Sequence, residues 1–212
     1  MPRNKYPEET VQRILDASLK LFLEKGYEQT TVLDIVDSLG GLTRGAFYHH
    51  FKSKEEVLDA LGDKLFYEDN PFEAVQKLSH LNGLEQIRWV LAASLSKSEN
   101  RQIGAQSLFL FKSPAFLKKL VDENRDILAP MFQALIEEGI RDGSIKAQNP
   151  KLLAELLTFL TNIWMIPTVY PCSEEEQWQK FYMVKEICEK MGIPVFDEEL
   201  TALCEHNAIY ID

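Results

Sequence analysis

Residues 38–54 contain side chains suited to binding a polyanion. No Asp or Glu occurs in this stretch, although the whole chain has 33 acidic and 23 basic residues. A helix that begins after Thr43 would expose a face that is uncharged or cationic, made of Arg44, Gly45, Ala46, His49 and His50. Because nucleic acid phosphates are negatively charged, such a face attracts them. The stretch therefore predicts contact with DNA.

Short helices with recognisable caps must position this face. The first should begin near Pro7 and end at Lys25, followed by a C-cap glycine. The second should begin after Thr31 as N-cap and end at Gly40-Gly41. The third follows the hydroxyl of Thr43, and a fourth begins at Ser53 with Glu56 three residues on, which is a capping box. Three helices joined in this way form a helix-turn-helix bundle, whose third helix enters the major groove.

The rest of the chain is also predicted to be helical. No convincing run of alternating apolar and polar residues suggests a strand, so the sequence predicts an all-α fold. Proline, glycine and asparagine mark the ends of the further helices. Their expected spans are 72–81, 84–97, 101–111, 114–141, 150–166, 174–191 and 197–208.

The charge is distributed unevenly. The net charge of −10 argues against a nucleic acid partner when the chain is taken as a whole. Residues 1–54, however, have 8 Lys and Arg against 7 Asp and Glu, and residues 55–212 have 15 against 26. A slightly positive head on an acidic body predicts a small, salt-sensitive contact with DNA. Repulsion of the body from the DNA backbone would favour binding by two correctly spaced heads.

Several other classes are not indicated. The N-terminus lacks the apolar region of a secretory signal, and the most apolar stretch, 152–170, is interrupted by Glu155, Asn162 and Pro167. We therefore expect a cytoplasmic protein without a membrane span. The three cysteines form no CxxC pair and are expected to be free thiols in a reducing compartment: Cys172, Cys188 and Cys204. Neighbouring histidines on a helix point about 100° apart, so His49 and His50 are not expected to bind one metal ion.

The N-terminal segment resembles the TetR/AcrR family of bacterial transcriptional regulators. The resemblance covers residues 8–68 and rests on Thr30-Thr31-Val32, on Tyr48-His49-His50-Phe51, and on the following Ser53-Lys54-Glu55-Glu56. One departure lies at Gly40-Gly41, where this chain has one residue more than the family usually has. The longer turn is expected to change the angle of the third helix.

The resemblance implies roles for individual residues in a helix-turn-helix at 31–51. Arg44 and Ala46 would reach base edges, because a guanidinium fits guanine O6 and N7 and a methyl group fits the thymine methyl. The complete predicted DNA-binding set is Thr31, Thr43, Arg44, Gly45, Ala46, Tyr48, His49, His50, Lys52 and Lys54. Plainer alternatives stay open, since the threonines are caps in any case, Tyr48 could pack in the core, and an isolated Arg or Lys is an ordinary solvated charge.

The resemblance also implies that residues 69–212 bind a small-molecule effector and form a homodimer, with residues 1–68 as the DNA-binding domain. The helix at 150–166 is apolar nearly all round, so one face could fill the core and another could meet a partner. Together with the helix at 174–191 it could form a four-helix dimer interface. The alternative is a fully buried helix in a monomer.

An effector pocket would need apolar walls and a few polar groups. The candidates are Trp89, Gln106, Phe109, Phe132, Phe159, Asn162 and Trp164. For each aromatic residue core packing is an alternative, and for Asn162 and Gln106 the alternative is a hydrogen-bonded buried amide. No cofactor is predicted, and the effector stays unidentified.

The predicted function is a dimeric repressor that leaves a near-palindromic operator when it binds an effector. One alternative is a DNA-binding protein without small-molecule regulation, acting as a corepressor-binding or assembly module. A helical enzyme is a further alternative, but the chain contains no Glu-x-x-His pair, no His-Glu-x-x-His and no Gly-x-Ser-x-Gly. The spacing of Gly40 and Gly45 matches a phosphate-binding loop, but Ala46-Phe47 follows where such a loop needs Lys and Ser or Thr.

Overall fold

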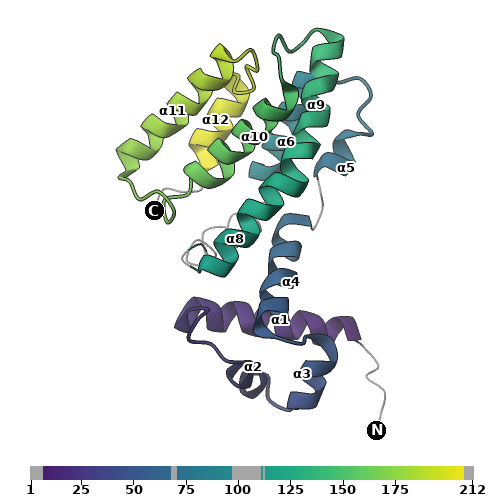
Figure 1. The fold of residues 1–212 in the computed structure, drawn as a ribbon, viewed down its shortest axis with the longest axis vertical. Coiled ribbons are helices and arrows are strands. Elements are labelled where there is room, and N and C mark those ends of the chain that lie inside the picture. The colour runs from purple at the N-terminus through teal and green to yellow at the C-terminus, as the bar shows by residue number, and fades with distance from the viewer. Residues whose placement is uncertain (1–6, 68–70, 97–110, 112, 208–212) are drawn as a thin grey trace. The chain divides into compact units, whose positions relative to one another are not determined.

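A computed structural model of the protein describes residues 7–67, 71–96, 111 and 113–207. Throughout these ranges every regular element is a helix, which confirms the predicted all-α fold (Figure 1). None of the described helices is long and apolar enough to span a membrane. The predicted helix at 101–111 lies outside the described residues except for Phe111.

The chain divides into two compact units. The first comprises residues 1–68 together with 109–117, and the second comprises residues 69–108 and 118–212. Helix α8 (Pro114–Glu123) therefore begins in the first unit and continues into the second. The sequence alone did not place any part of residues 69–212 in the N-terminal unit.

The first unit contains the four N-terminal helices at the predicted positions. They are α1 (Pro7–Lys25), α2 (Val32–Ser38), α3 (Arg44–His50) and α4 (Lys54–Tyr67). Gly26 adopts φ +87° directly after α1, as expected for a glycine that ends a helix. The Ser53 Oγ atom accepts a hydrogen bond from the Glu56 N–H (3.3 Å), and the Glu56 carboxylate accepts one from the Lys52 N–H (2.7 Å). These bonds satisfy backbone donors at the start of α4.

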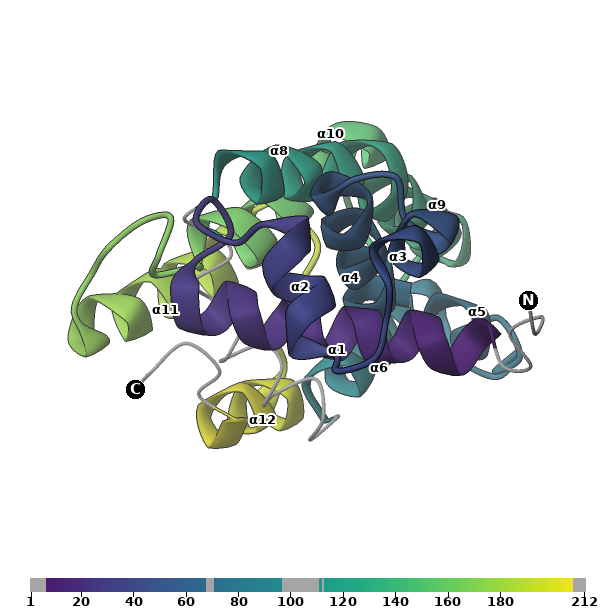
Figure 2. The same cartoon turned by 90° about the horizontal axis from the view of Figure 1, so that it is seen from below.

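Apolar side chains from all four helices form the core of this unit. Fully buried examples are Ile14, Phe22, Ile35, Phe47 and Val57. Figure 2 shows the unit from the side of α2 and α3, with α2 in front of α1. Phe116 from the first turns of α8 belongs to the same cluster and is 2% exposed. A residue that is distant in sequence therefore completes this core.

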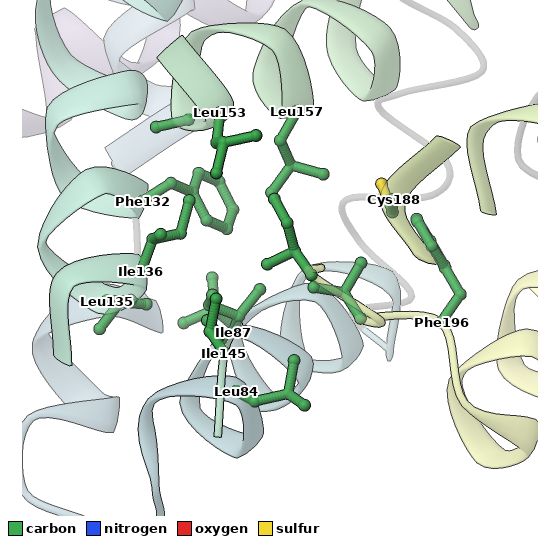
Figure 3. Close-up of a cluster of buried hydrophobic side chains, with 14 of the residues drawn as sticks. Leu84, Ile87, Phe132, Leu135, Ile136, Ile145, Leu153, Leu157, Cys188 and Phe196 are labelled. Atoms are coloured by element: carbon green, nitrogen blue, oxygen red, sulfur yellow. The ribbon is translucent and has the colours of Figure 1, made fainter. Parts of the chain in front are cut away.

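The second unit is a helical bundle around its own apolar core. Its helices are α5 (Pro71–Val75), α6 (Gly83–Ser96), α9 (Ala129–Asp142), α10 (Pro150–Phe159), α11 (Glu174–Lys190) and α12 (Glu198–Asn207). Leu84 and Ile87 of α6 meet Phe132 and Ile136 of α9 and Leu157 of α10 in this core (Figure 3).

Helix α5 ends earlier than the predicted span 72–81. After Val75 the chain forms tight turns, in which the Lys77 N–H donates to the Ala74 carbonyl (3.1 Å). The chain must then reach Gly83, where α6 begins against α9. A β-carbon at Gly83 would lie 2.1 Å from the Gly139 nitrogen, and the Gly83 N–H donates to the Asp142 carboxylate (2.7 Å). The turns end α5 at Val75, and the close packing of Gly83 on α9 fixes where α6 begins.

Two helices of the second unit contain a π-helical turn. The first turn, Asn124–Leu128, joins α8 to α9 in one continuous helix. Pro130 follows two residues later and cannot donate a backbone hydrogen bond. Residues Leu160–Trp164 extend α10 in the same way. The Asn162 Nδ2 donates to Asn124 Oδ1 (3.2 Å), so an amide pair joins the two turns.

The three cysteines are free, as predicted. Burial, followed by the nearby Glu189 carboxylate, raises the pKa of the Cys188 thiol to about 12. Burial and the nearby Glu205 raise the pKa of Cys204 to about 11. Both groups are therefore uncharged thiols at neutral pH, and such thiols are poor nucleophiles.

Candidate nucleic-acid interface

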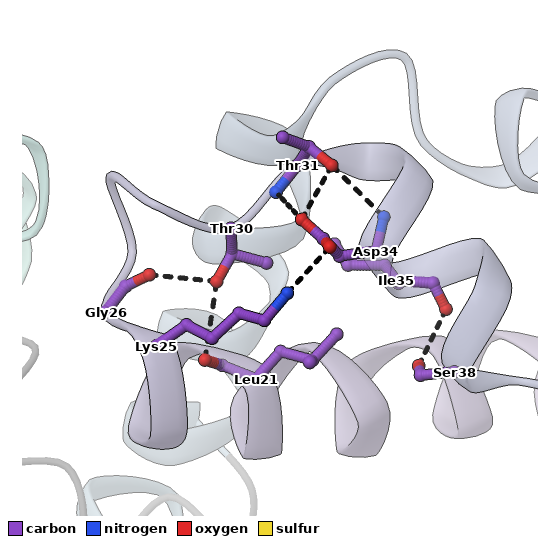
Figure 4. Close-up of polar contacts among 8 residues, drawn as sticks. All are labelled: Leu21, Lys25, Gly26, Thr30, Thr31, Asp34, Ile35 and Ser38. Atoms are coloured by element: carbon purple, nitrogen blue, oxygen red, sulfur yellow. Dashed lines mark hydrogen bonds and ion pairs between the residues drawn. The ribbon is translucent and has the colours of Figure 1, made fainter.

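The start of α2 is held by a reciprocal cap (Figure 4). The Asp34 N–H donates to Thr31 Oγ1 (3.1 Å), while the Thr31 N–H and hydroxyl donate to the Asp34 carboxylate (2.8 and 2.7 Å). Lys25 Nζ forms an ion pair with the other Asp34 oxygen (2.7 Å). Thr31 is exposed, so its hydroxyl can face a phosphate, but its role as a cap alone would explain its presence.

Acidification is expected to weaken this cap. Hydrogen bonds from Lys25, and then from Thr31, hold the pKa of Asp34 well below its ordinary value. A carboxylate with a lowered pKa stabilises the fold above its unfolded-state pKa of about 4, and this contribution is lost as the pH falls. Asp34→Asn should therefore lower the thermal unfolding midpoint at neutral pH, and the difference from wild type should narrow from about pH 5 toward pH 2.

The exposed Asp37 on the same helix gives the control for this prediction. Asp37→Asn should leave the midpoint nearly unchanged at every pH, because this carboxylate does not cap the helix. A difference between Asp34→Asn and wild type that stays constant with pH would contradict the prediction.

Helix α3 presents the predicted face to solvent. Thr43 Oγ1 accepts a hydrogen bond from the Ala46 N–H (3.1 Å) and so caps the helix, while Phe47 is fully buried. Arg44, Gly45 and His49 are exposed, and Ala46 and His50 are half-buried. These five residues of α3 therefore remain accessible to the major groove of DNA.

Tyr48 does not pack in the core. Its side chain is 43% exposed, and the Arg44 guanidinium carbon lies 5.7 Å from the centre of its ring. The Tyr48 ring thus lies next to the cation at the start of α3. This position is compatible with a phosphate contact beside a base contact.

The rings of the two histidines pack edge to face. Their ring centroids are 5.1 Å apart at an angle of 73°. Among the described residues no group of three His, Cys, Asp or Glu side chains could hold a metal ion. Burial, and then the neighbouring His49, lowers the pKa of His50 below its ordinary value, so His50 is mostly neutral at neutral pH.

The two lysines between α3 and α4 differ in their surroundings. Lys52 is exposed. Lys54 Nζ donates to the backbone carbonyl of Tyr27 (2.7 Å) and lies 4.2 Å from the centre of the Tyr27 ring. Lys54 thus joins the start of α4 to the α1–α2 connection, and its role at a phosphate stays a prediction. Arg13 of α1 bonds to the end of α2. This contact could not be predicted, because a solvent-facing Arg in a helix gives no local signal of its partner.

Comparisons with known proteins identify the family of this chain. The profile described as "Bacterial regulatory proteins, tetR family" matches residues 14–61. The HTH-type transcriptional repressor KstR2 of Rhodococcus jostii is 31% identical over 141 residues, which cover 63% of this chain and 67% of that protein. The chain belongs to the TetR family.

Other comparisons agree with this assignment. KstR2 of Mycolicibacterium smegmatis is 27% identical over 191 residues, covering 84% of this chain and 89% of that protein. A solved TetR-family structure from Syntrophomonas wolfei matches with a TM-score of 0.61 at 20% identity, covering 90% of this chain and 98% of that one. This structural likeness shows the TetR fold, with an N-terminal helix-turn-helix and a C-terminal helical domain.

This TetR-family protein is a DNA-binding transcriptional regulator and not an enzyme. Members of the family bind operator DNA, usually act as dimers and typically respond to small-molecule effectors. The sequence resemblance is thereby confirmed.

The predicted pocket residues differ in how exposed they are. Phe132 is buried in the core with its ring 4.9 Å from that of Phe72, whereas Phe159 is 41% exposed. Trp89 and Trp164 are half-buried. Gln106 and Phe109 lie outside the described residues. Contact of any of these residues with an effector stays a prediction.

Asn162 is part of a hydrogen-bonded amide pair. Its partner Asn124 is 4% exposed and also donates to the Leu120 carbonyl (2.9 Å). Asn162 is therefore a hydrogen-bonded amide in this structure, which was the alternative to a polar anchor in an effector pocket. One N–H and the oxygen of the Asn162 amide remain for other partners, since a carboxamide has two donors and two acceptor positions.

Proposed function

We propose that the protein is a cytoplasmic repressor that binds a near-palindromic operator as a homodimer and leaves it when a small-molecule effector binds. Residues 1–68 would bind DNA, and residues 69–212 would bind the effector and the partner subunit. The exposed face of α3 without acidic residues is the observation that carries the DNA part of the proposal. Two such helices, one from each subunit, would enter successive major grooves about one helical turn apart or somewhat more.

The DNA-binding set is proposed with the roles that its surroundings support. Arg44 and Ala46 at the start of α3 would read base edges. Thr31, Thr43, Tyr48, His49 and Lys52 would hold phosphates, with Gly45 and His50 close to the groove wall and Lys54 at the start of α4. Purified protein should enrich particular duplexes from a random pool at low salt. Recovery of a pool without sequence preference would sink the proposal.

An exposed apolar stripe supports the dimer. Leu152 is 60% exposed and Phe159 is 41% exposed, and with Leu156 they lie on one face of α10. Tyr182 and Met183 of α11 are 49% and 53% exposed. Exposed apolar side chains that share one helix face, as on α10, are typical of protein–protein contact. A helix buried on all sides in a monomer would not show it.

Placing a charge in this stripe should separate the subunits. Leu152→Glu would bury like charges across a two-fold axis, and it should weaken association by at least about tenfold, because an uncompensated buried charge costs several kcal/mol. Analytical ultracentrifugation measures the change. The matched control is Val121→Glu, which changes a 40% exposed apolar residue of α8 outside the stripe and should stay dimeric. If Val121→Glu dissociates and Leu152→Glu stays dimeric, the interface does not lie on this stripe.

The effector part of the proposal rests on the family. A thermal-shift screen of metabolites, followed by release of the protein from its selected duplex, would identify an effector. A ligand must prefer the DNA-incompetent state by several kcal/mol to act in this way. If no compound in a broad set raises the unfolding midpoint, the protein is better described as a DNA-binding module without small-molecule regulation.

A further inference from the structure

The connection between α2 and α3, residues 39–43, contains two glycines with few contacts. Gly40 and Gly41 adopt φ +49° and +94°, in the left-handed region that favours glycine. Apart from their chain neighbours, no heavy atom lies within 4 Å of the place where either residue would carry a β-carbon. No neighbouring atom therefore crowds the Cβ position of either residue. Because glycine populates positive and negative φ about equally, their peptide planes can turn at little cost.

The two ends of this connection are held by specific contacts. After it, Thr43 caps α3 and Phe47 is buried in the core. Before it, the Arg13 guanidinium of α1 donates from Nη2 to the carbonyl of Leu39, the C-cap of α2 (3.1 Å). A cation is favoured at this place, because the last carbonyls of a helix carry partial negative charge.

The Arg13 bond fixes the first peptide plane of the turn. The Leu39 carbonyl belongs to the peptide that links Leu39 to Gly40, so this plane cannot turn over while the carbonyl is held. The other link across the plane is weaker, since the Gly40 N–H lies 3.5 Å from the Asp37 carbonyl. Without Arg13 the two glycines would sample other conformations, and the start of α3 would be held by its own cap and by Phe47 alone.

We propose that Arg13 is a positioning residue for sequence recognition. Its guanidinium holds the longer turn of this chain in one conformation, and so it keeps Arg44 and Ala46 aligned with their base edges without touching DNA. The proposal rests on the proposed DNA-binding function. It assigns selectivity to a side chain of α1 that does not belong to the helix-turn-helix.

The test compares Arg13→Met with Lys20→Met. Lys20 is also on α1, and its side chain is 74% exposed. Both changes remove one positive charge. Binding is measured for a duplex selected by wild-type protein and for duplexes with single base-pair substitutions, over a series of salt concentrations. Arg13→Met should reduce discrimination between them by about threefold to tenfold, the value of one modest hydrogen bond. Lys20→Met should not change it.

The salt dependence separates positioning from direct contact. For a positioning residue, the slope of log affinity against log salt should stay the same in Arg13→Met and Lys20→Met. If Arg13→Met instead weakens all duplexes equally and lowers the slope by about 0.9, Arg13 binds a phosphate and the proposal is wrong. Unchanged discrimination would overturn it as well.

A measurement without DNA tests the Arg13 bond by itself. Amide hydrogen exchange at Leu39 and Gly40, whose N–H groups donate to the Val36 and Asp37 carbonyls (3.3 and 3.5 Å), should be faster in Arg13→Met than in wild type or Lys20→Met. Equal exchange rates would overturn the proposed constraint. If wild-type protein selects no duplex at all, the proposed function fails, while the exchange rates still decide whether Arg13 restrains the turn.

Discussion

Replacing Arg44 by alanine should relax recognition at one base position and cost about 1–3 kcal/mol of specific binding. Arg44 is the first residue of α3 and is exposed. In the part of the chain that the structure describes, no carboxylate pairs with its guanidinium, whose contact is with the Tyr48 ring. Its donors are therefore available for a bidentate contact to guanine.

The experiment compares Arg44→Ala with Lys52→Ala on the selected duplex and on duplexes with single substitutions. Lys52→Ala should weaken all sequences alike and lower the salt slope by about one, as loss of a phosphate contact does. Arg44→Ala should remove the preference at one position and leave the others. If Arg44→Ala behaves like Lys52→Ala, the longer turn has placed Arg44 on the DNA backbone.

The positions of the N-terminal helices could be predicted because local signals determine them. Thr31, Thr43 and Ser53 each bond to a backbone N–H three residues on, and Gly26 ends α1 in a conformation that favours glycine. Such bonds depend on residues that are close in sequence. The type of residue at the cap is therefore enough to locate the helix start.

The contacts that tie the helices together could not be predicted in this way. Arg13 bonds to a carbonyl 26 residues later, and Lys54 bonds to one 27 residues earlier. Both side chains look like ordinary solvated cations in the sequence. The close approach of Gly83 to α9 at the start of α6 is likewise a tertiary contact. Local periodicity carries no information about partners at this distance.

These contacts also change the interpretation of the charge in the N-terminal unit. Lys25 pairs with Asp34, and Arg13 and Lys54 donate to backbone carbonyls. Among the described basic residues on the α3 side, Arg44 and Lys52 are exposed and therefore available to DNA. We therefore expect few ionic contacts with DNA and a shallower salt dependence than the charge distribution alone predicted.

The largest effect on stability is expected for Phe116→Ala. Phe116 is 2% exposed within the core of the N-terminal unit, and its ring lies 5.1 Å from that of Phe111. Removal of a buried phenylalanine leaves a cavity and costs about 3–5 kcal/mol. The loss should fall on α1, α2 and α3, although Phe116 is carried by α8. Hydrogen exchange in peptides from these helices should therefore become faster.

The tryptophans allow the two units to be followed separately. Trp89, Trp164 and Trp178 are the three tryptophans of the chain, and all lie in the second unit. The denaturant midpoint from tryptophan fluorescence should change little in Phe116→Ala, while exchange in the N-terminal helices increases. Val121→Ala, at a 40% exposed position of the same helix, should alter neither. If Phe116→Ala lowers the tryptophan midpoint and leaves the N-terminal helices protected, its side chain stabilises the second unit. Residues 1–68 would then not need residues 109–117 to complete their core.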